Sequence, residues 1–416
     1  MKIILHTLIC IMSISMANAQ IVNIPDSNFK AALVNNAAIN TNGDAEIQVV
    51  EATAFTGQLY VFNMGIGDLT GIEAFTALTT LDCSFNQLAS LDFSTNTALN
   101  RLYCHYNQLT SLDVSANTAL THLDCDSNQL TSLDVSADTA LTYLYCDKNQ
   151  LASLDVSANT ALYVLYCGNN QLTSLDFSTN TALNRLDCCY NQLTSLDVSA
   201  NTALNYLFCD NNQLASLDVS ANTALYVLYC ENNQLTSLDF SATTALTELY
   251  CDYNQLTSLD VSANTALIGF YCTNNQLTSL NVQNGNNVNF SDFNALNNPN
   301  LTCIQVDSVA FSNANWSAYK DSIASFSTNC VTSVSDISNL ATIQIAPNPA
   351  NDLVTVNSYN YIQKIELINM QGQIIEKVLV NYHSSLLDVS NISNGIYQLK
   401  FSSSNQSQIK RLVVAH

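Results

Sequence analysis

The sequence repeats itself with a period of 21 residues. The stretch from Leu120 to Ala140 reads LTHLDCDSNQLTSLDVSADTA, and nearly the same string returns when it is shifted by 21 residues in either direction. Ten such units cover residues 78–287. A fixed period of this length is typical of a solenoid, in which each unit is one coil stacked on the next. The rest of the chain is then expected to cap the ends of the stack or to direct the protein to its cellular location.

Each unit contains two rows of apolar residues that alternate with polar ones. In the first row, Leu123 and Cys125 should point inward from a short strand, and Val135 belongs to the second row. Copies of the strand in successive coils, about 4.8 Å apart, should pair as a parallel sheet. An Asn at one place in every unit, such as Asn128, suits a buried ladder that satisfies backbone groups where the chain bends. One coil alone buries too little apolar surface to be stable, so stability is expected only from the stack.

The pattern LxxLxCxxNxL resembles the leucine-rich repeat, in the short form of bacterial internalin-like surface proteins. The resemblance covers residues 78–287. It implies a mainly β fold, a parallel-sheet solenoid of ten coils with the strands on its concave side. The second half of the unit, LxSLDVSxNTA, departs from the family because it repeats the strand-like rhythm. Short strands or turns are therefore expected on the convex side instead of α-helices.

Residues 1–19 have the features of a secretory signal peptide. They combine one Lys, an apolar run and the small-residue motif Ala17-Asn18-Ala19 before Gln20. A membrane anchor is the alternative, but the run is too short to span a bilayer. No other segment resembles a transmembrane helix, so the protein is expected to be exported.

Residues 20–77 are expected to form a small helical N-terminal cap with an irregular first coil. Within it, a twelve-residue stretch resembles the calcium loop of EF-hand or dockerin proteins. Two departures are Asn40 in place of the usual first Asp and Ala45 in place of Gly. The resemblance predicts structural calcium, and the alternative is a vestigial loop that binds no metal. The ligand positions are Asn40, Asn42, Asp44 and Glu51.

Residues 288–330 break the period and are expected to form a C-terminal cap. Export implies an oxidising route, so Cys303 and Cys330 are predicted to form a disulfide that locks this cap. The Ser-rich residues 331–342 are expected to be a linker.

Residues 343–416 share nothing with the repeats, and their alternating segments predict a small β-sandwich. They resemble the C-terminal sorting domain of the type IX secretion system, type A. The matching features are Pro347-Asn348-Pro349, the turn Met370-Gln371-Gly372-Gln373, Asp388-Val389-Ser390, Asn394-Gly395-Ile396-Tyr397 and the basic end Lys410-Arg411. The resemblance implies contact with the secretion machinery, passage across the outer membrane and removal of the domain. A plain β-sandwich adhesion domain is the alternative.

Composition and spacing argue against nucleic acid binding and against catalysis. Eleven basic and 33 acidic residues give a net charge of −22, which disfavours a nucleic acid partner. No catalytic constellation is found, so no enzyme and no cofactor beyond the possible calcium are predicted. One Cys recurs in each unit at a position that faces inward, which indicates packing in the core. A metal site is disfavoured, because a straight row of Cys cannot supply tetrahedral geometry. The members of this Cys column are Cys83, Cys104, Cys125, Cys146, Cys167, Cys188, Cys209, Cys230, Cys251 and Cys272.

The position just before each of these Cys residues faces outward on the strands and is rich in aromatic residues. Exposed aromatic rows on a rigid sheet suit protein hot spots or stacking on sugars. The alternative is that cross-strand aromatic pairs simply stabilise the sheet. The candidate binding residues are Tyr103, Tyr145, Tyr166, Phe208, Tyr229, Tyr250 and Tyr271, with Asp124 and Asp187 at the same position.

Two functions remain from the sequence. The first is a secreted or surface-attached binding protein for a protein or glycan ligand, active after removal of residues 1–19 and 343–416. The second is a structural surface-layer or matrix component without a discrete ligand. A lytic enzyme is a distant third, because no catalytic site is found.

Overall fold

The structure is a computed structural model that describes residues 20–330, 343–369, 373–402 and 407–416. The predicted signal peptide, the predicted linker and most of the predicted turn at 370–373 lie outside these residues. The described residues divide into two compact units, one that ends at Asn329 and one that begins at Cys330.

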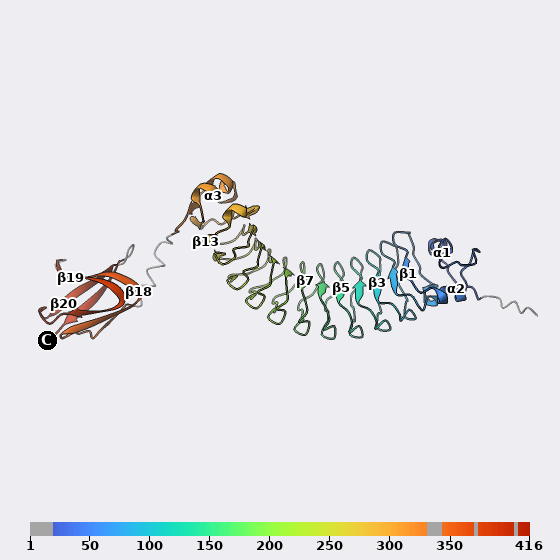
Figure 1. Ribbon diagram of the computed structural model, residues 1–416, viewed down its shortest axis with the longest axis horizontal. Helices are drawn as coiled ribbons and strands as arrows, with labels where there is room; N and C mark the ends of the chain where they lie inside the picture. The colour runs from blue at the N-terminus through green and yellow to red at the C-terminus, as the bar shows by residue number, and fades with distance from the viewer. Residues whose placement is uncertain (1–19, 331–342, 370–372, 403–406) are drawn as a thin grey trace, which may run out of the picture. The chain divides into compact units, whose positions relative to one another are not determined.

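The first unit is a solenoid whose coils are stacked along one 12-stranded parallel sheet (Figure 1). Each strand has three residues and pairs with its copy in the next coil, so that Leu102 lies opposite Leu123. In order across the sheet, the strands are β1 (Gln58–Tyr60), β2 (Thr80–Asp82), β3 (Arg101–Tyr103), β4 (His122–Asp124), β5 (Tyr143–Tyr145), β6 (Val164–Tyr166), β7 (Arg185–Asp187), β8 (Tyr206–Phe208), β9 (Val227–Tyr229), β10 (Glu248–Tyr250), β12 (Gly269–Tyr271) and β14 (Asp292–Asn294). The predicted leucine-rich-repeat solenoid is confirmed, and the sheet continues into both caps.

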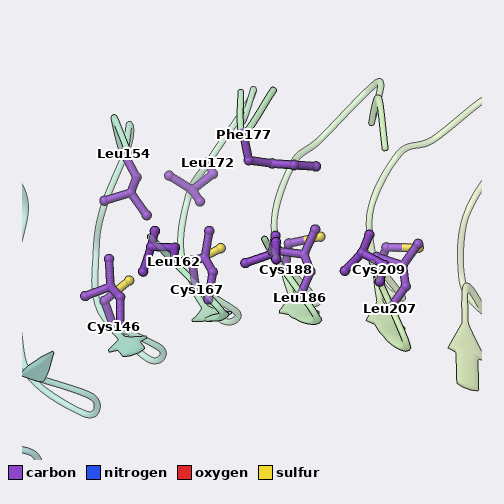
Figure 2. Close-up of a cluster of buried hydrophobic side chains, with 14 of the residues drawn as sticks. Cys146, Leu154, Leu162, Cys167, Leu172, Phe177, Leu186, Cys188, Leu207 and Cys209 are labelled. Atoms are coloured by element: carbon purple, nitrogen blue, oxygen red, sulfur yellow. The ribbon is translucent and has the colours of Figure 1, made fainter. Parts of the chain in front are cut away.

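The core of the solenoid consists of the inward rows predicted from the alternation. Figure 2 shows Cys146, Cys167, Cys188 and Cys209 at the same place in four successive coils, among Leu side chains. These four Cys residues are fully buried. A thiol at this place acts as a small apolar side chain between stacked coils.

The predicted Asn ladder is buried beside the Cys column. The side-chain amide of Asn170 donates to the carbonyl oxygens of Cys146 and Cys167 at 3.0 and 3.1 Å, and to that of Gly168 at 3.1 Å. Its Oδ1 accepts a hydrogen bond from the backbone N–H of Leu151 at 2.9 Å. One side chain therefore satisfies backbone groups of two neighbouring coils where the chain turns away from the strand.

The surface opposite the strands is made of turns, with a second parallel sheet at its C-terminal end. That sheet contains β11 (Ser258–Asp260), β13 (Ser279–Asn281), β15 (Cys303–Gln305) and β16 (Ser325–Ser327). In most coils an exposed Asp, such as Asp176, accepts a hydrogen bond from the backbone N–H two residues on. Turns and short strands thus replace helices here, as the strand-like second half of the repeat predicts.

A second column of buried polar residues lies in the return of each coil and is absent from the sequence-based predictions. Asn180 donates its side-chain amide to the carbonyl oxygens of Val156 and Asn159 at 3.0 and 2.7 Å. Each coil that has Asn at this place is thus held to its predecessor at a second place. The members, all 0% exposed, are Asn96, Asn117, Asp138, Asn159, Asn180, Asn201, Asn222, Thr243 and Asn264.

Asp138 is the one acidic residue in this second column. An ionised carboxylate cannot donate to the carbonyl oxygens that the Asn residues bind. Neither side-chain oxygen of Asp138 has a hydrogen-bond partner among the described residues. Burial, followed by the nearby charge of Asp134, raises the pKa of Asp138 from 3.8 to about 7.

Caps close both ends of the stack. At the N-terminal end lie α1 (Ser27–Val34), α2 (Val49–Ala54) and η1 (Ile72–Ala74), and Asp26 caps α1 by accepting from two backbone N–H groups. At the other end lie η2 (Asn287–Asn289), α3 (Val309–Asn315) and η3 (Ser317–Tyr319). Cys303 and Cys330 form the predicted disulfide.

The second unit is an antiparallel β domain with its own apolar core. Its strands are β17 (Gln344–Ala346), β18 (Leu353–Ile368), β19 (Ile374–Asp388), β20 (Gly395–Ser402) and β21 (Ser407–Val414). The long β18 pairs with β17, β19 and β20, with register shifts near its middle. Val354, Leu367, Leu399 and Leu412 are among the buried residues between the strands. The predicted C-terminal β domain is confirmed.

The thiols of the Cys column should stay reduced and unreactive in the folded protein. Burial raises the pKa of Cys167 and its counterparts well above the ordinary value, so little reactive thiolate forms. Alkylation of the native protein followed by non-reducing peptide mapping should find the column unlabelled and Cys303 joined to Cys330. Denatured protein provides the positive control for labelling. Column cysteines that are linked to each other, or labelled in the folded state, would contradict this prediction.

Candidate binding surface

The outward side chains of the parallel strands form one continuous surface, here called the strand face. In each three-residue strand the middle residue, Leu or Phe, is buried, while the third side chain faces outward and is at least partly exposed. The seven predicted aromatic residues and the two predicted Asp residues all occupy the third position and are partly exposed. The parallel register therefore aligns the predicted binding residues along the sheet.

Four of these residues form an unbroken row, here called the aromatic strip. The strip is Phe208, Tyr229, Tyr250 and Tyr271. Ring centroids in consecutive strands lie 5.1 Å apart for Phe208 and Tyr229, and 4.8 Å apart for Tyr250 and Tyr271. Tyr229 and Tyr250 lie 4.4 Å apart with an interplanar angle of 3°. The strip is thus a set of rings in mutual contact, held at the spacing of the strands.

The stacking of Tyr229 on Tyr250 restricts what the strip can offer to a ligand. Because the two ring planes are nearly parallel and in contact, each ring covers one face of the other. At each of these two rings, one face is therefore closed to a ligand. Stacking on sugars needs free ring faces, so this geometry favours contacts with ring edges and hydroxyl groups over sugar stacking at these two residues.

Two carboxylates from the first strand position accompany the strip. The hydroxyl of Tyr229 donates to Oε2 of Glu248 at 2.6 Å, and the hydroxyl of Tyr271 donates to Oδ1 of Asp292 at 3.4 Å. Burial, followed by the hydrogen bond and charge of Glu248, raises the pKa of Tyr229. The sequence-based predictions omit Glu248 and Asp292, because the first strand position carries no recurring residue type. The outward parity of the first position is the signal that identifies them.

The remaining predicted residues lie on the same face but outside the strip. Tyr145 and Tyr166 form an isolated edge-to-face pair with centroids 5.2 Å apart. Asp187 separates this pair from the strip and accepts a hydrogen bond from its own loop, at the backbone N–H of Cys189. Tyr103 pairs with Asp124 across β3 and β4, and Asp124 forms an ion pair with His105 at 3.0 Å. The nine predicted residues therefore divide into a strip, a pair and separate polar contacts.

A column of partly buried carboxylates runs beside the third strand position. Burial is the largest influence in each case and raises the pKa of Asp147 to about 8 and that of Glu231 to about 7. The pKa values of Asp210 and Asp252 are raised for the same reason. These groups lie at the edge of the strand face, where they take up protons at a higher pH than exposed carboxyls do.

A pocket of about 380 Å³ lies where the strip meets the C-terminal cap. Tyr271 and Asp292 belong to its lining, as do the aromatic residues of the cap around Trp316. Trp316 stacks on Phe293 with centroids 4.3 Å apart. The sequence did not reveal the pocket, because α3 and β14 meet only in the folded cap.

Three of the four predicted calcium ligands, Asn40, Asn42 and Asp44, lie in one loop of the N-terminal cap, and Glu51 lies in the following helix α2. Their side chains form hydrogen bonds within this segment. Oε1 of Glu51 accepts from the backbone N–H groups of Thr41 and Asn42 at 2.8 and 3.1 Å. Asn40 donates its side-chain amide to the carbonyl oxygen of Asp44 at 2.8 Å. These contacts are those of a loop closed by its own hydrogen bonds, and calcium binding stays a prediction.

The stacked coils and the C-terminal domain define the class of the protein. Residues 344–415 match the family described as the secretion system C-terminal sorting domain. The chain is therefore a leucine-rich-repeat protein that carries a type IX secretion sorting domain. Such a domain implies a secreted or cell-surface protein. In the described part of the chain, no helix is both long and apolar enough to cross a membrane.

Two solved structures from Listeria monocytogenes are similar to this chain. The functional domain of InlJ, which is described as including a cysteine ladder, is 26% identical, with a TM-score of 0.57 and coverage of 95% of this chain and 98% of that one. The internalin InlF is 22% identical, with a TM-score of 0.60 and coverage of 74% and 95%. The buried Cys column is thus a feature that this chain shares with the InlJ domain. A comparison with curated protein sequences found no match.

Proposed function

We propose that the protein is a secreted or surface-attached binding protein that holds a protein or glycan ligand on its strand face. The aromatic strip is the observation that carries this proposal. Its rings are partly exposed, in contact with one another, and fixed by a sheet whose core is fully buried. Rigid aromatic clusters lose little conformational entropy on binding and are typical hot spots of protein interfaces.

A structural surface-layer component is the second candidate, and the ring contacts are also what favours it. Cross-strand aromatic pairs stabilise a sheet by a few tenths to about 1 kcal/mol each. The parallel stack of Tyr229 and Tyr250 would serve that purpose without any ligand.

Replacing Tyr250 with Ala distinguishes the two candidates. In a binding protein, the variant should lose about 2 kcal/mol of binding free energy, or roughly 30-fold in affinity, toward a ligand identified with the mature protein on a glycan array or by pull-down. In a structural component, any interaction should survive, while stability falls by up to about 1 kcal/mol. Asp239→Ala, on the surface of turns, is the control for both measurements. Unchanged affinity in the Tyr250 variant would exclude the strip as the binding site.

The protein at the cell surface should lack both its N-terminal signal and its sorting domain. This expectation follows from the presence of the sorting domain. The same domain leads us to expect passage across the outer membrane, followed by attachment to the surface or release. Intact-mass measurement of protein released from the surface should give a chain without residues 1–19 and without approximately residues 343–416. A surface form that retains Lys410 and Arg411 would contradict the prediction.

A further inference from the structure

One stretch of the solenoid, between Arg185 and Lys320, contains no basic side chain. The last basic side chain on the strand face is Arg185, and residues 186–319 contain no Lys, Arg or His. The aromatic strip and the pocket beside the C-terminal cap both lie within this range. The coils of this part of the molecule therefore contain carboxylates but no basic residue that could neutralise them.

The carboxylates next to the strip are paired with neutral groups. Glu248 accepts from the Tyr229 hydroxyl, and Asp292 accepts from the hydroxyls of Tyr271 and Ser291. One oxygen of Glu231 is buried without a hydrogen-bond partner among the described residues. The ion pairs between described side chains lie elsewhere: Lys30–Glu46, His105–Asp124 and Lys364–Glu366. Glu248 is partly buried and Asp292 is exposed. Carboxylates that the chain does not neutralise attract a cationic partner.

The strand face already shows how it accommodates a guanidinium group. The guanidinium carbon of Arg185 lies 4.3 Å from the centroid of the Tyr206 ring in the next strand. This is the geometry of a cation–π contact. Beyond Arg185 the face keeps its rings and its carboxylates. The next cation of the chain, Lys320, directs its ammonium group to the carbonyl oxygens of Asp321 and Ala324 in the cap.

The pocket provides room for a long basic side chain. Its volume of about 380 Å³ lies among the rings of Tyr271, Phe293 and Trp316, with Asp292 in the lining. Arg and Lys bury their methylene stems against apolar surface while the charged head contacts a carboxylate. Aromatic walls and one carboxylate are the matching surface for such a side chain.

We infer that this acidic–aromatic end of the strand face, formed by Tyr229, Glu248, Tyr250, Tyr271 and Asp292, binds a cationic segment of a protein partner. An Arg or Lys side chain of that segment occupies the pocket against Tyr271 and Asp292. The inference rests on the proposed binding function and specifies the chemistry of the partner. A neutral glycan fits less well, because Tyr229 and Tyr250 each cover one face of the other's ring and a glycan does not use the negative charge.

Fluorescence anisotropy on the mature protein tests this inference. The probe is a fluorescein-labelled peptide of alternating Gly, Ser and Arg, and the comparison peptide carries Asp in place of Arg. The Arg peptide should bind and the Asp peptide should not. Asp292→Asn should weaken binding about tenfold, as expected for the loss of one charge pair that the bound peptide covers. Tyr271→Ala should also weaken it, and thermal melting should show that both variants remain folded.

Asp239→Asn removes the same charge from the opposite surface and is the matched control. It should change the affinity for the Arg peptide less than about twofold, since a distant exposed charge is screened by salt. An equal loss in Asp239→Asn and Asp292→Asn would overturn the inference, because the net charge of −22 would then attract the peptide diffusely. No binding of the Arg peptide would overturn it as well. If Tyr250→Ala still weakened binding of an identified ligand, the proposed binding function would stand without this inference.

Discussion

Replacing Asn170 with Ala should destabilise the solenoid by about 4 kcal/mol, at roughly 1 kcal/mol for each of four hydrogen bonds. The side chain donates to three carbonyl oxygens and accepts from one backbone N–H, and these backbone groups lie in the core. Ala leaves them without partners, and the site is closed to water by the stacked coils. Urea unfolding followed by circular dichroism should show a lower midpoint in the variant.

The exposed turn residue Asp176 provides the matched control. It also accepts a backbone hydrogen bond, from Ser178, but at a place open to solvent. Water can replace that contact, so Asp176→Ala should leave the unfolding midpoint nearly unchanged. Equal effects of the two substitutions would show that the ladder contributes no more than a surface turn.

Replacing Asp138 with Asn should have the opposite effect and stabilise the protein by roughly 3 kcal/mol at about pH 8. By the offsets that Asn159 and Asn180 show, the side chain at 138 faces the carbonyl oxygens of Val114 and Asn117. An Asn amide donates to such oxygens, whereas an ionised carboxylate repels them. Urea midpoints of the two proteins measure the difference.

The gain from Asp138→Asn should depend on pH in a direction set by the raised pKa. Since the folded protein holds this proton up to about pH 7 and the unfolded chain releases it near 3.8, the folded state binds more protons between these values. Stability that is present in acid is therefore lost as the pH rises through this window. The difference between variant and wild type should be small near pH 4, grow toward pH 7 and then level off. Parallel stability curves across this range would refute an ionisable Asp138 inside the column.

The coil and its core were predictable because they depend on the 21-residue period and on the alternation of inward and outward side chains along a strand. Leu123 and Cys125 are buried where the alternation places them, and Asn128 lies in the predicted ladder. The period alone determines which side chains recur at the same place in the stack. The same reasoning predicts the third-position row that contains the aromatic strip.

The second Asn column was not predictable by the same reasoning. Asn180 stands among Ser and Thr residues, in a stretch that has the composition of an exposed turn. It is fully buried because the return of one coil packs on the return of the next, which no residue pattern within one unit encodes. Asp138 occupies the same place in its unit, in a stretch of the same composition.

The candidate site was predictable in its positions but not in its geometry. The register places Tyr229, Tyr250 and Tyr271 in one row, as parity requires. Whether their rings stack or meet edge to face depends on side-chain rotamers and on neighbours such as Glu248, which lie in other columns. The pocket depends on the cap, whose sequence does not follow the repeat.

The register of the sheet also affects how the chain can change in length. From β2 to β12, each strand residue pairs with the residue 21 positions further along the chain. The offset is 22 residues between β1 and β2 and 23 residues between β12 and β14. Loss or duplication of any 21 consecutive residues between β2 and β12 would therefore return every column to register and leave both caps intact. Such a change would shorten or lengthen the row of outward side chains by one step of about 4.8 Å. Unequal recombination between the nearly identical units could thus adjust the reach of this surface in whole steps, without a new fold and without loss of the ends that close it.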